Sequence, residues 1–153
     1  MENTENRYIE AVKEFHNKFG HPIGKFGEEP DTSVTTLRFE LLHEELGELA
    51  TALIKKDGTE VVDALVDLQY VLSGTVVAFG LQDLFAESFE EVHASNMSKL
   101  GENGKPIYRE DGKILKGPNY FKPRLCDIIK DHLNKKDAQN NIDFPESRTR
   151  TSD

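Results

Sequence analysis

Apolar residues recur at near-helical spacing in several stretches of the chain, and breaker residues separate these stretches. The first stretch predicts an amphipathic helix from about Arg7 to Phe19, which Gly20 and Pro22 end. The segment that follows, as far as Ser33, is rich in glycine and proline and has no periodic pattern, so it is predicted to be a loop.

Two long helices joined by a tight turn are predicted next. The earlier one runs from about Val34 to Lys56, and Asp57-Gly58 ends it. Thr59 is the predicted cap of the later one, which continues to about Phe79. The core stripe of the earlier helix is predicted to be made of leucines: Leu37, Leu41, Leu42, Leu46, Leu49 and Leu53. The later helix is apolar on nearly all sides, which is typical of a helix at the centre of a bundle.

A fourth helix is predicted from about Leu84 to Lys99, with Asp83 as its cap. The density of glycine and proline over residues 101–122 excludes a helix there, although residues 108–114 can form a short hairpin around Asp111-Gly112.

Pro123 could open a short fifth helix, after which almost nothing is apolar. We therefore expect an all-α fold, a bundle of four to five helices. The expected organisation is one domain over residues 1–133 and a disordered tail over residues 134–153.

Glu44, Glu45 and Glu48 form an EExxE group on the first of the long helices. An acidic group of this kind is by itself usually a solvated face. The next helix changes that interpretation, because Asp63 and Asp67 lie one turn apart within a segment whose other residues mostly require burial.

No Lys or Arg lies between Lys56 and Lys99 to compensate this charge, so a metal ion is the expected counter-charge. Ligands that are all oxygen select Mg²⁺, with Mn²⁺ as a possible substitute. Glu60 shares the same face. It could be a metal ligand, but we favour the interpretation that its negative charge stabilises the N-terminus of the helix. Hard metals on facing acidic helices indicate a phosphate-bearing substrate.

The glycine- and proline-rich segment contains the densest basic stretch before the C-terminal region, and it could either bind phosphate or be a solvated loop. Its basic residues are Lys99, Lys105, Arg109, Lys113 and Lys116. His16 lies alone on a helix, where a surface or satisfied core role is the usual one. Phe15 and Phe19 could stack on a nucleobase, but core packing is favoured.

Charge and cysteine content narrow the function further. A formal net charge of -9 disfavours nucleic acid and anionic membranes as partners. The single cysteine excludes an intramolecular disulfide and suits a reducing compartment. With no basic, apolar leader at the start and no segment near the roughly 20 apolar residues of a membrane span, a soluble cytoplasmic protein is expected.

The acidic groups resemble those of the all-α NTP pyrophosphohydrolases, which include MazG, dimeric dUTPases and phosphoribosyl-ATP pyrophosphohydrolase. The mark of that group is EExxE on one helix and ExxD on the next, and residues 44–48 match the first half. For the second half, Glu60-x-x-Asp63 has the required letters. Asp67-Leu68-Gln69-Tyr70-Val71 is similar to the family's Asp-Leu-x-Tyr-Val stretch, and we favour that register.

Residues 91–99 and 111–116 extend the resemblance to MazG-like and dUTPase-like proteins of bacteria and phages. The resemblance implies hydrolysis of an NTP or dNTP to the monophosphate and pyrophosphate, in a homodimer or dimer of dimers. It also places Asn96, Lys99, Lys113 and Lys116 near the nucleotide.

We expect Glu44, Glu48, Asp63 and Asp67 to hold Mg²⁺, with Glu45 either a further ligand or the base that activates water. Two alternatives stay open. One is a narrower substrate: dUTP, dCTP or phosphoribosyl-ATP. The other is a helical dimer without activity that binds a nucleotide or a cation.

Overall fold

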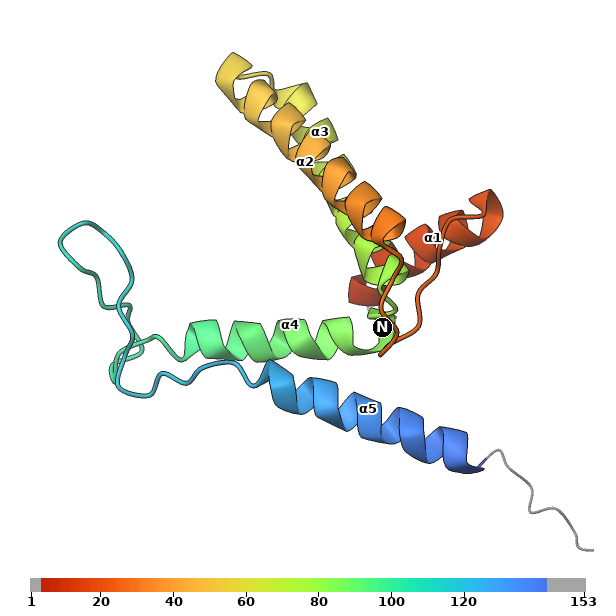
Figure 1. Cartoon of the computed structure of the whole chain (residues 1–153). Helices are drawn as coiled ribbons and strands as arrows, with labels where there is room; N and C mark the ends of the chain where they lie inside the picture. The colour runs from red at the N-terminus through yellow and green to blue at the C-terminus, as the bar shows by residue number, and fades with distance from the viewer. Residues whose placement is uncertain (1–3, 143–153) are drawn as a thin grey trace, which may run out of the picture. The chain divides into compact units, whose positions relative to one another are not determined.

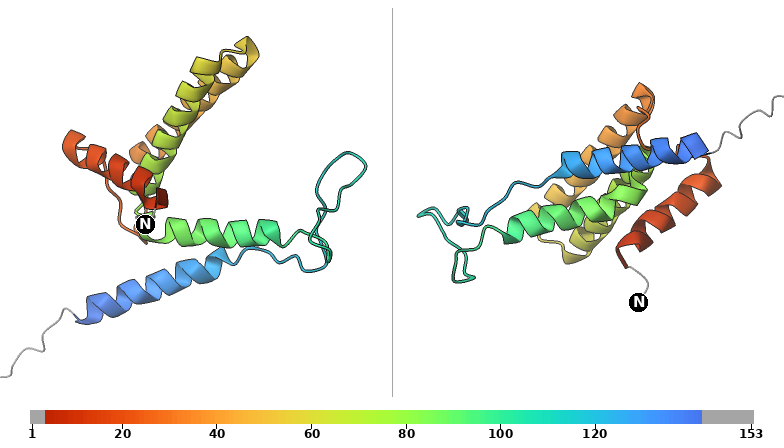
Figure 2. Two further views of the ribbon diagram at one scale, coloured as in Figure 1. Left: turned by 180° about the vertical axis from the view of Figure 1, so that it is seen from behind. Right: turned by 90° about the horizontal axis from the view of Figure 1, so that it is seen from below.

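The computed structural model describes residues 4–142, and they form an all-helical fold. Figures 1 and 2 show the five helices in chain order. Their bounds are α1 Thr4–Phe19, α2 Thr32–Lys55, α3 Gly58–Ala78, α4 Gln82–Met97 and α5 Leu125–Ile142. The predicted fold class is therefore confirmed, and a single isolated bridge between Tyr108 and Ile114 is the only extended pairing within residues 4–142.

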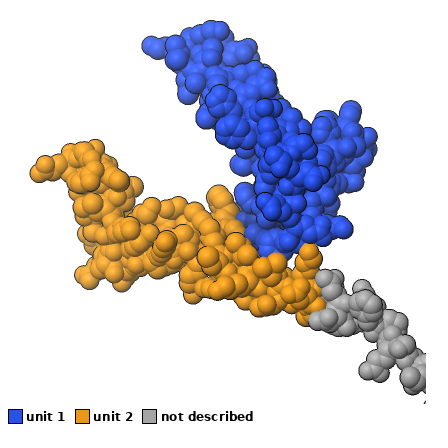
Figure 3. Space-filling view, viewed as in Figure 1, with its two compact units in different colours: residues 1–86 blue, residues 87–153 orange. Residues whose placement is uncertain are grey.

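The chain divides into two compact units, residues 1–86 and residues 87–153, which Figure 3 distinguishes by colour. The boundary falls within α4. The organisation as one domain over residues 1–133 stays a prediction.

In the first unit, α3 packs against both α1 and α2. The core lies at the C-terminal end of α3, where Ile9, Val76 and Val77 are buried together and Leu81 and Phe85 pack against them. The loop after α1 approaches this end closely, because the Gly24 amide donates to the Val77 carbonyl at 3.0 Å. A Cβ at Gly24 would lie 2.3 Å from the Ala78 carbonyl oxygen, so only glycine permits this approach.

The turn between α2 and α3 is made by two consecutive residues. Lys56 ends α2 in the left-handed conformation, with φ 57°. The Asp57 carboxylate then accepts hydrogen bonds from the amides of Thr59 and Glu60. The predicted cap at Thr59 was therefore wrong, because the aspartate two positions earlier already satisfies the free amides. Likewise, α4 begins at Gln82, which places Asp83 inside its first turn rather than at the cap.

The predicted core stripe of α2 is only partly buried. Leu37, Leu46 and Leu53 are exposed, whereas the buried residues of α2 are Arg38 and Ala52. The helix α3 contacts both α1 and α2, as predicted for a helix at the centre of a bundle, but it is not buried along its whole length. Its C-terminal end is enclosed, but most of its apolar residues before Ser73 are exposed: Val62, Leu65, Val66, Tyr70 and Leu72. The two helices therefore carry more apolar residues than one copy of the chain buries.

The aromatic residues at the end of α1 are also more open than predicted. Phe15 is half-buried and stacks on Phe19, with ring centroids 4.3 Å apart. Phe19 itself is 67 % exposed, so core packing describes Phe15 better than Phe19.

Of the helices in residues 4–142, α3 has the length and apolar composition that a bilayer span requires. The expectation that no segment approaches that requirement was wrong. Core helices of helical bundles pass the same test of length and composition.

In the second unit, the segment after α4 folds back on the end of that helix. Gly117 donates its amide to the Lys99 carbonyl at 3.0 Å, and the buried Ser95 hydroxyl donates to the Phe121 carbonyl at 2.8 Å. Between these ties, the predicted hairpin is confirmed by the Tyr108–Ile114 bridge and by a bond from the Arg109 amide to the Lys113 carbonyl. Residues 101–122 contain no helix, as predicted.

The fifth helix is longer than predicted. It begins at Leu125 and continues to Ile142, so residues 134–142 of the predicted tail are helical. The remainder of that tail, residues 143–153, lies outside the described residues.

Candidate active site

Three glutamates project from the middle of α2. Glu45 is half-buried, whereas Glu44 and Glu48 are exposed. Glu45 lies seven residues after Arg38 and seven before Ala52, the two buried residues of this helix. Two turns of helix separate residues seven apart, so Glu45 belongs to the face of α2 that turns inward.

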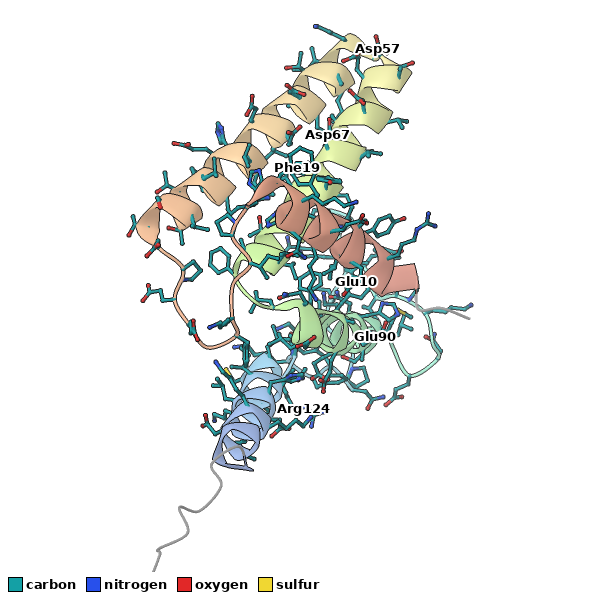
Figure 4. The ribbon with its side chains drawn as sticks, turned by 90° about the vertical axis from the view of Figure 1, so that its right-hand side faces the viewer. Glu10, Phe19, Asp57, Asp67, Glu90 and Arg124 are labelled. Atoms are coloured by element: carbon teal, nitrogen blue, oxygen red, sulfur yellow. The ribbon has the colours of Figure 1, made fainter. Side chains whose placement is uncertain are left out.

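Two aspartates project from α3, and both Asp63 and Asp67 are exposed. Asp67 lies seven residues before Gly74, which is buried at the enclosed end of the helix. Figure 4 shows Asp57 at the tip of the α2–α3 hairpin and Asp67 part of the way along α3.

The two helices run antiparallel in a constant register. Arg38 contacts α3 at Gly74, where an added Cβ would lie 2.6 Å from the guanidinium, and it donates a hydrogen bond to the Val71 carbonyl. Moving seven residues along each helix from the pair Arg38 and Gly74 leads to Glu45 and Asp67. The sequence-predicted acidic groups of the two helices are therefore brought opposite one another.

The electrostatics of Glu45 agree with this register. Burial raises the pKa of Glu45 first, and then the negative charges of Asp67, Glu48, Glu44 and Asp63 raise it further. These four carboxylates are the ones that the sequence grouped with Glu45. None of the five forms an ion pair among the described residues, so their mutual repulsion is not relieved within this unit.

The donor set fits a hard divalent cation by its chemistry, because five carboxylates offer oxygen ligands without His or Cys. The side chains are not gathered around a common point, however. Within the described residues, no group of three or more Asp, Glu, His or Cys side chains is arranged to hold a metal ion. Ligation would therefore require rotamer changes of these mostly exposed carboxylates, while the helices supply their common face.

Glu60 lies in the first turn of α3 and is exposed. Its amide is bonded to the Asp57 cap at 3.3 Å. A negative side chain at this end of a helix interacts favourably with the helix dipole, and this role for Glu60 stays a prediction.

The four predicted phosphate-binding residues all belong to the second unit. Lys99 donates to the Asn96 side-chain oxygen at 2.7 Å, so these two are brought together. Lys116 lies over the Tyr120 ring, 4.3 Å from its centroid. The Lys113 side chain is exposed, and its amide donates to the Asp111 carboxylate, which also pairs with Arg109.

The sequence did not indicate a polar cluster at the enclosed end of α3. Arg38 is 7 % exposed and His16 is 3 % exposed. His16 donates through Nδ1 to the Pro22 carbonyl at 2.7 Å, and burial and the nearby Arg38 lower its pKa. The available signal was a lone arginine seven residues before the motif glutamate, in a stripe otherwise made of leucines.

An all-helical chain with opposed acidic groups on a helical hairpin has the architecture of an NTP pyrophosphohydrolase. The model of the phosphoribosyl-ATP pyrophosphohydrolase family matches residues 12–96, more than half of the chain and both acidic groups. The chain belongs to this family of all-α pyrophosphohydrolases.

Two individual proteins are also similar. An uncharacterized protein of Acanthamoeba polyphaga mimivirus is 31 % identical over 145 residues, which cover 87 % of this chain and 54 % of the viral protein. The chain thus spans about half the length of that relative. A solved structure of a candidate NTP pyrophosphohydrolase from Exiguobacterium sp. 255-15 is 25 % identical and covers 87 % of this chain and 97 % of its own, with a TM-score of 0.41.

Proposed function

We propose that the chain is a Mg²⁺-dependent nucleoside triphosphate pyrophosphohydrolase, which converts an NTP or dNTP and water to the monophosphate and pyrophosphate. The observation that carries this proposal is the position of Glu45, which is half-buried on α2 and whose pKa is raised by the charges of four further carboxylates from α2 and α3. Such a concentration of uncompensated acid is costly for folding alone and useful for metal-assisted phosphate chemistry.

In this proposal, Glu44, Glu48, Asp63 and Asp67 hold Mg²⁺, for which Mn²⁺ can substitute. The metal supplies charge neutralisation of the triphosphate, which the carboxylates would otherwise repel. Glu45, the half-buried member of the group, orients water and accepts its proton. The new bond joins the water oxygen to the α-phosphorus, the bond to the bridging oxygen breaks, and pyrophosphate leaves with that electron pair.

The charge of the departing pyrophosphate requires cations. We assign this role to Lys113 and Lys116, and we assign contacts to the bound nucleotide to Asn96 and Lys99. Replacing Lys113 with alanine is expected to raise KM more than it lowers kcat, because the lysine neutralises charge present in substrate and product alike.

The function is tested by incubating the chain with Mg²⁺ and a panel of ribo- and deoxyribonucleotides, and by measuring pyrophosphate and monophosphate. Glu48→Ala should abolish turnover while circular dichroism remains helical. Glu40→Ala is the matched control, because Glu40 is an exposed glutamate of the same helix outside the acidic groups. Tight nucleotide binding without turnover across the panel would instead favour a helical protein that only binds nucleotide or metal.

A second candidate substrate is phosphoribosyl-ATP, which the description of the matched family favours. It belongs in the same panel together with dUTP and dCTP. A kcat/KM for phosphoribosyl-ATP at least tenfold above that for every ordinary nucleotide would replace the general assignment with this one.

We also propose that two copies of the chain, or two such pairs, associate through α2 and α3. The support is the apolar surface that these helices leave open, including Leu53, Val62 and Val66, each more than half exposed. Sedimentation velocity should show at least a dimer, and Val66→Asp should shift it towards the monomer. A monomeric wild-type chain at micromolar concentration would contradict this assembly.

A further inference from the structure

Arg38 is a buried cation without a carboxylate partner. Its side chain is 7 % exposed, and no ion pair reaches it from the described residues. Its hydrogen bonds go instead to α3: the guanidinium donates to the Val71 carbonyl at 2.6 Å and to the Thr75 hydroxyl at 3.3 Å. Burying an unpaired charge is costly, so this arrangement is a poor way to gain stability alone.

These bonds are the polar connection between the two helices that carry the acids. No other side chain of α2 hydrogen-bonds to α3 among the described residues, and only Ala52 and Ala64 are buried along the rest of the hairpin. One end of the hairpin is fixed by the turn at Lys56 and Asp57. Arg38 fixes the other end, and the opposed carboxylates lie between these two points.

Like charges on the two helices favour a sliding or splaying motion that separates them. A slip of one residue along α3 moves a side chain by about 1.5 Å along the axis and turns it by about 100°. Apolar contacts are not directional, so the buried alanines and the half-buried leucines and valines between these points specify the register weakly, whereas a planar guanidinium bonded to two acceptors permits one register.

We propose that Arg38 is a positioning residue, which holds the register in which the carboxylates of α2 and α3 face one another across the hairpin. The inference rests on the proposed function, because it concerns the same acidic site. Gly74 belongs to the device: an added Cβ there would lie 2.6 Å from the Arg38 guanidinium and 3.1 Å from His16 Nε2.

The test uses Mn²⁺ alone, without nucleotide, with binding to the full chain followed by electron paramagnetic resonance. Arg38→Met should weaken Mn²⁺ binding about tenfold, the scale known for residues that orient metal ligands. The Mn²⁺ affinity of Arg38→Lys should lie between those of wild type and Arg38→Met, since an ammonium can bond to one acceptor but lacks the planar fork. Gly74→Ala should give a similar loss by displacing the guanidinium while leaving Arg38 in the sequence.

Val76→Ala is the control for general destabilisation, because Val76 is buried in the core with α1 and makes no part of this connection. It should lower the melting temperature with an unchanged Mn²⁺ midpoint. If Arg38 affected the site only through its positive charge, its removal would tighten Mn²⁺ binding. Unchanged or tighter binding by Arg38→Met therefore overturns the inference, whereas a wild-type chain that binds no Mn²⁺ overturns the proposed function itself, and this inference with it.

Discussion

The two ends of α3 differ in what surrounds them. From Ser73 to Ala78 the helix is enclosed by α1, by the loop after α1 and by Arg38 of α2. From Gly58 to Leu72 only Ala64 is buried, and most of the apolar and all of the acidic side chains of this stretch are exposed. One continuous helix thus has a closed end that stabilises the fold and an open end that carries two aspartates of the candidate site.

The difference shows which part of α3 has its polar and apolar partners within the chain and which part does not. The closed end has its hydrogen-bond acceptors and apolar contacts within the chain. The open end has carboxylates without counter-charges and valines that are more than half exposed, and a metal ion and a second copy of the chain would compensate the charges and cover the valines. The following changes contrast the two ends, beginning with the largest effect.

Asp67→Asn should have the largest effect on catalysis and a small effect on folding. The substitution keeps the shape of the side chain but removes a charge from the open end, so kcat/KM should fall by about 10²-fold or more. Asp83→Asn, at an exposed aspartate of α4, should leave the rate unchanged. Steady-state pyrophosphate release measures both, and equal rates for the two variants would contradict a catalytic role for the open end.

Two valines of the same helix provide a stability comparison. Val77 is fully buried at the closed end, whereas Val62 is 62 % exposed at the open end. Val77→Ala should cost roughly 2 kcal/mol, from lost burial and the cavity left behind. Val62→Ala should stay within about 0.5 kcal/mol at concentrations where the chain is monomeric.

Urea denaturation at several protein concentrations checks this pair. If the open face is an interface, the loss from Val62→Ala should grow with concentration, because assembly then contributes to stability. Equal losses for the two valines at every concentration would show that the distinction between the ends is incorrect.

The sequence predicted elements more reliably than burial. Helical periodicity gave α1 to α4 to within a few residues, and the glycine- and proline-rich segment gave the hairpin. Leu46 and Leu53 were misjudged because a periodic stripe shows which face avoids water, but not whether the same copy covers it. The second half of α5 was missed because it has helix-forming polar residues with little apolar periodicity.

For the candidate site, the EExxE group of α2 and two aspartates one turn apart on the strongly apolar α3 allowed the five carboxylates to be grouped from the sequence, and their role in the site stays a prediction. The role of Arg38 was not predictable in the same way, since a single arginine among leucines forms no recognisable sequence motif. Its role depends on where α3 passes, and only the register of the folded hairpin supplies that information.

The open and closed ends should respond to pH in opposite directions. At the open end, the folded state holds the pKa of Glu45 above its ordinary value, so this group favours the fold at low pH. That contribution is lost as the pH rises through the raised pKa. In EDTA, Glu45→Gln should therefore melt roughly 1–3 °C above wild type at pH 8, since each like-charge contact costs a few tenths of a kcal/mol.

The difference between Glu45→Gln and wild type should vanish below pH 4, where the glutamate is protonated in both states. Mg²⁺ should also reduce it at pH 8 by compensating the charge in the wild type. Differential scanning calorimetry across this range provides the measurement, and a glutamine variant that is less stable than wild type at pH 8 in EDTA would contradict the repulsion inferred here.

At the closed end, burial lowers the pKa of His16, and the Arg38 charge lowers it further. The groups that face this ring are Arg38 from α2 and His21 from the following loop, both of which oppose a second charge, while the Pro22 carbonyl favours the protonated ring. The stability that neutral His16 contributes is therefore complete above about pH 6.5, its ordinary pKa, and declines as the pH falls towards the lowered value.

His16→Asn isolates this effect, because the asparagine amide can still donate to the Pro22 carbonyl but does not titrate. The variant should be less stable than wild type at pH 8, where it loses the packing of the ring. That deficit should shrink between pH 7 and pH 5 as the wild type alone is penalised for protonation. Because Glu45 belongs to the open end and His16 to the closed end, the double variant should show the sum of the two changes, and strong non-additivity would mean that the ends of α3 are not independent.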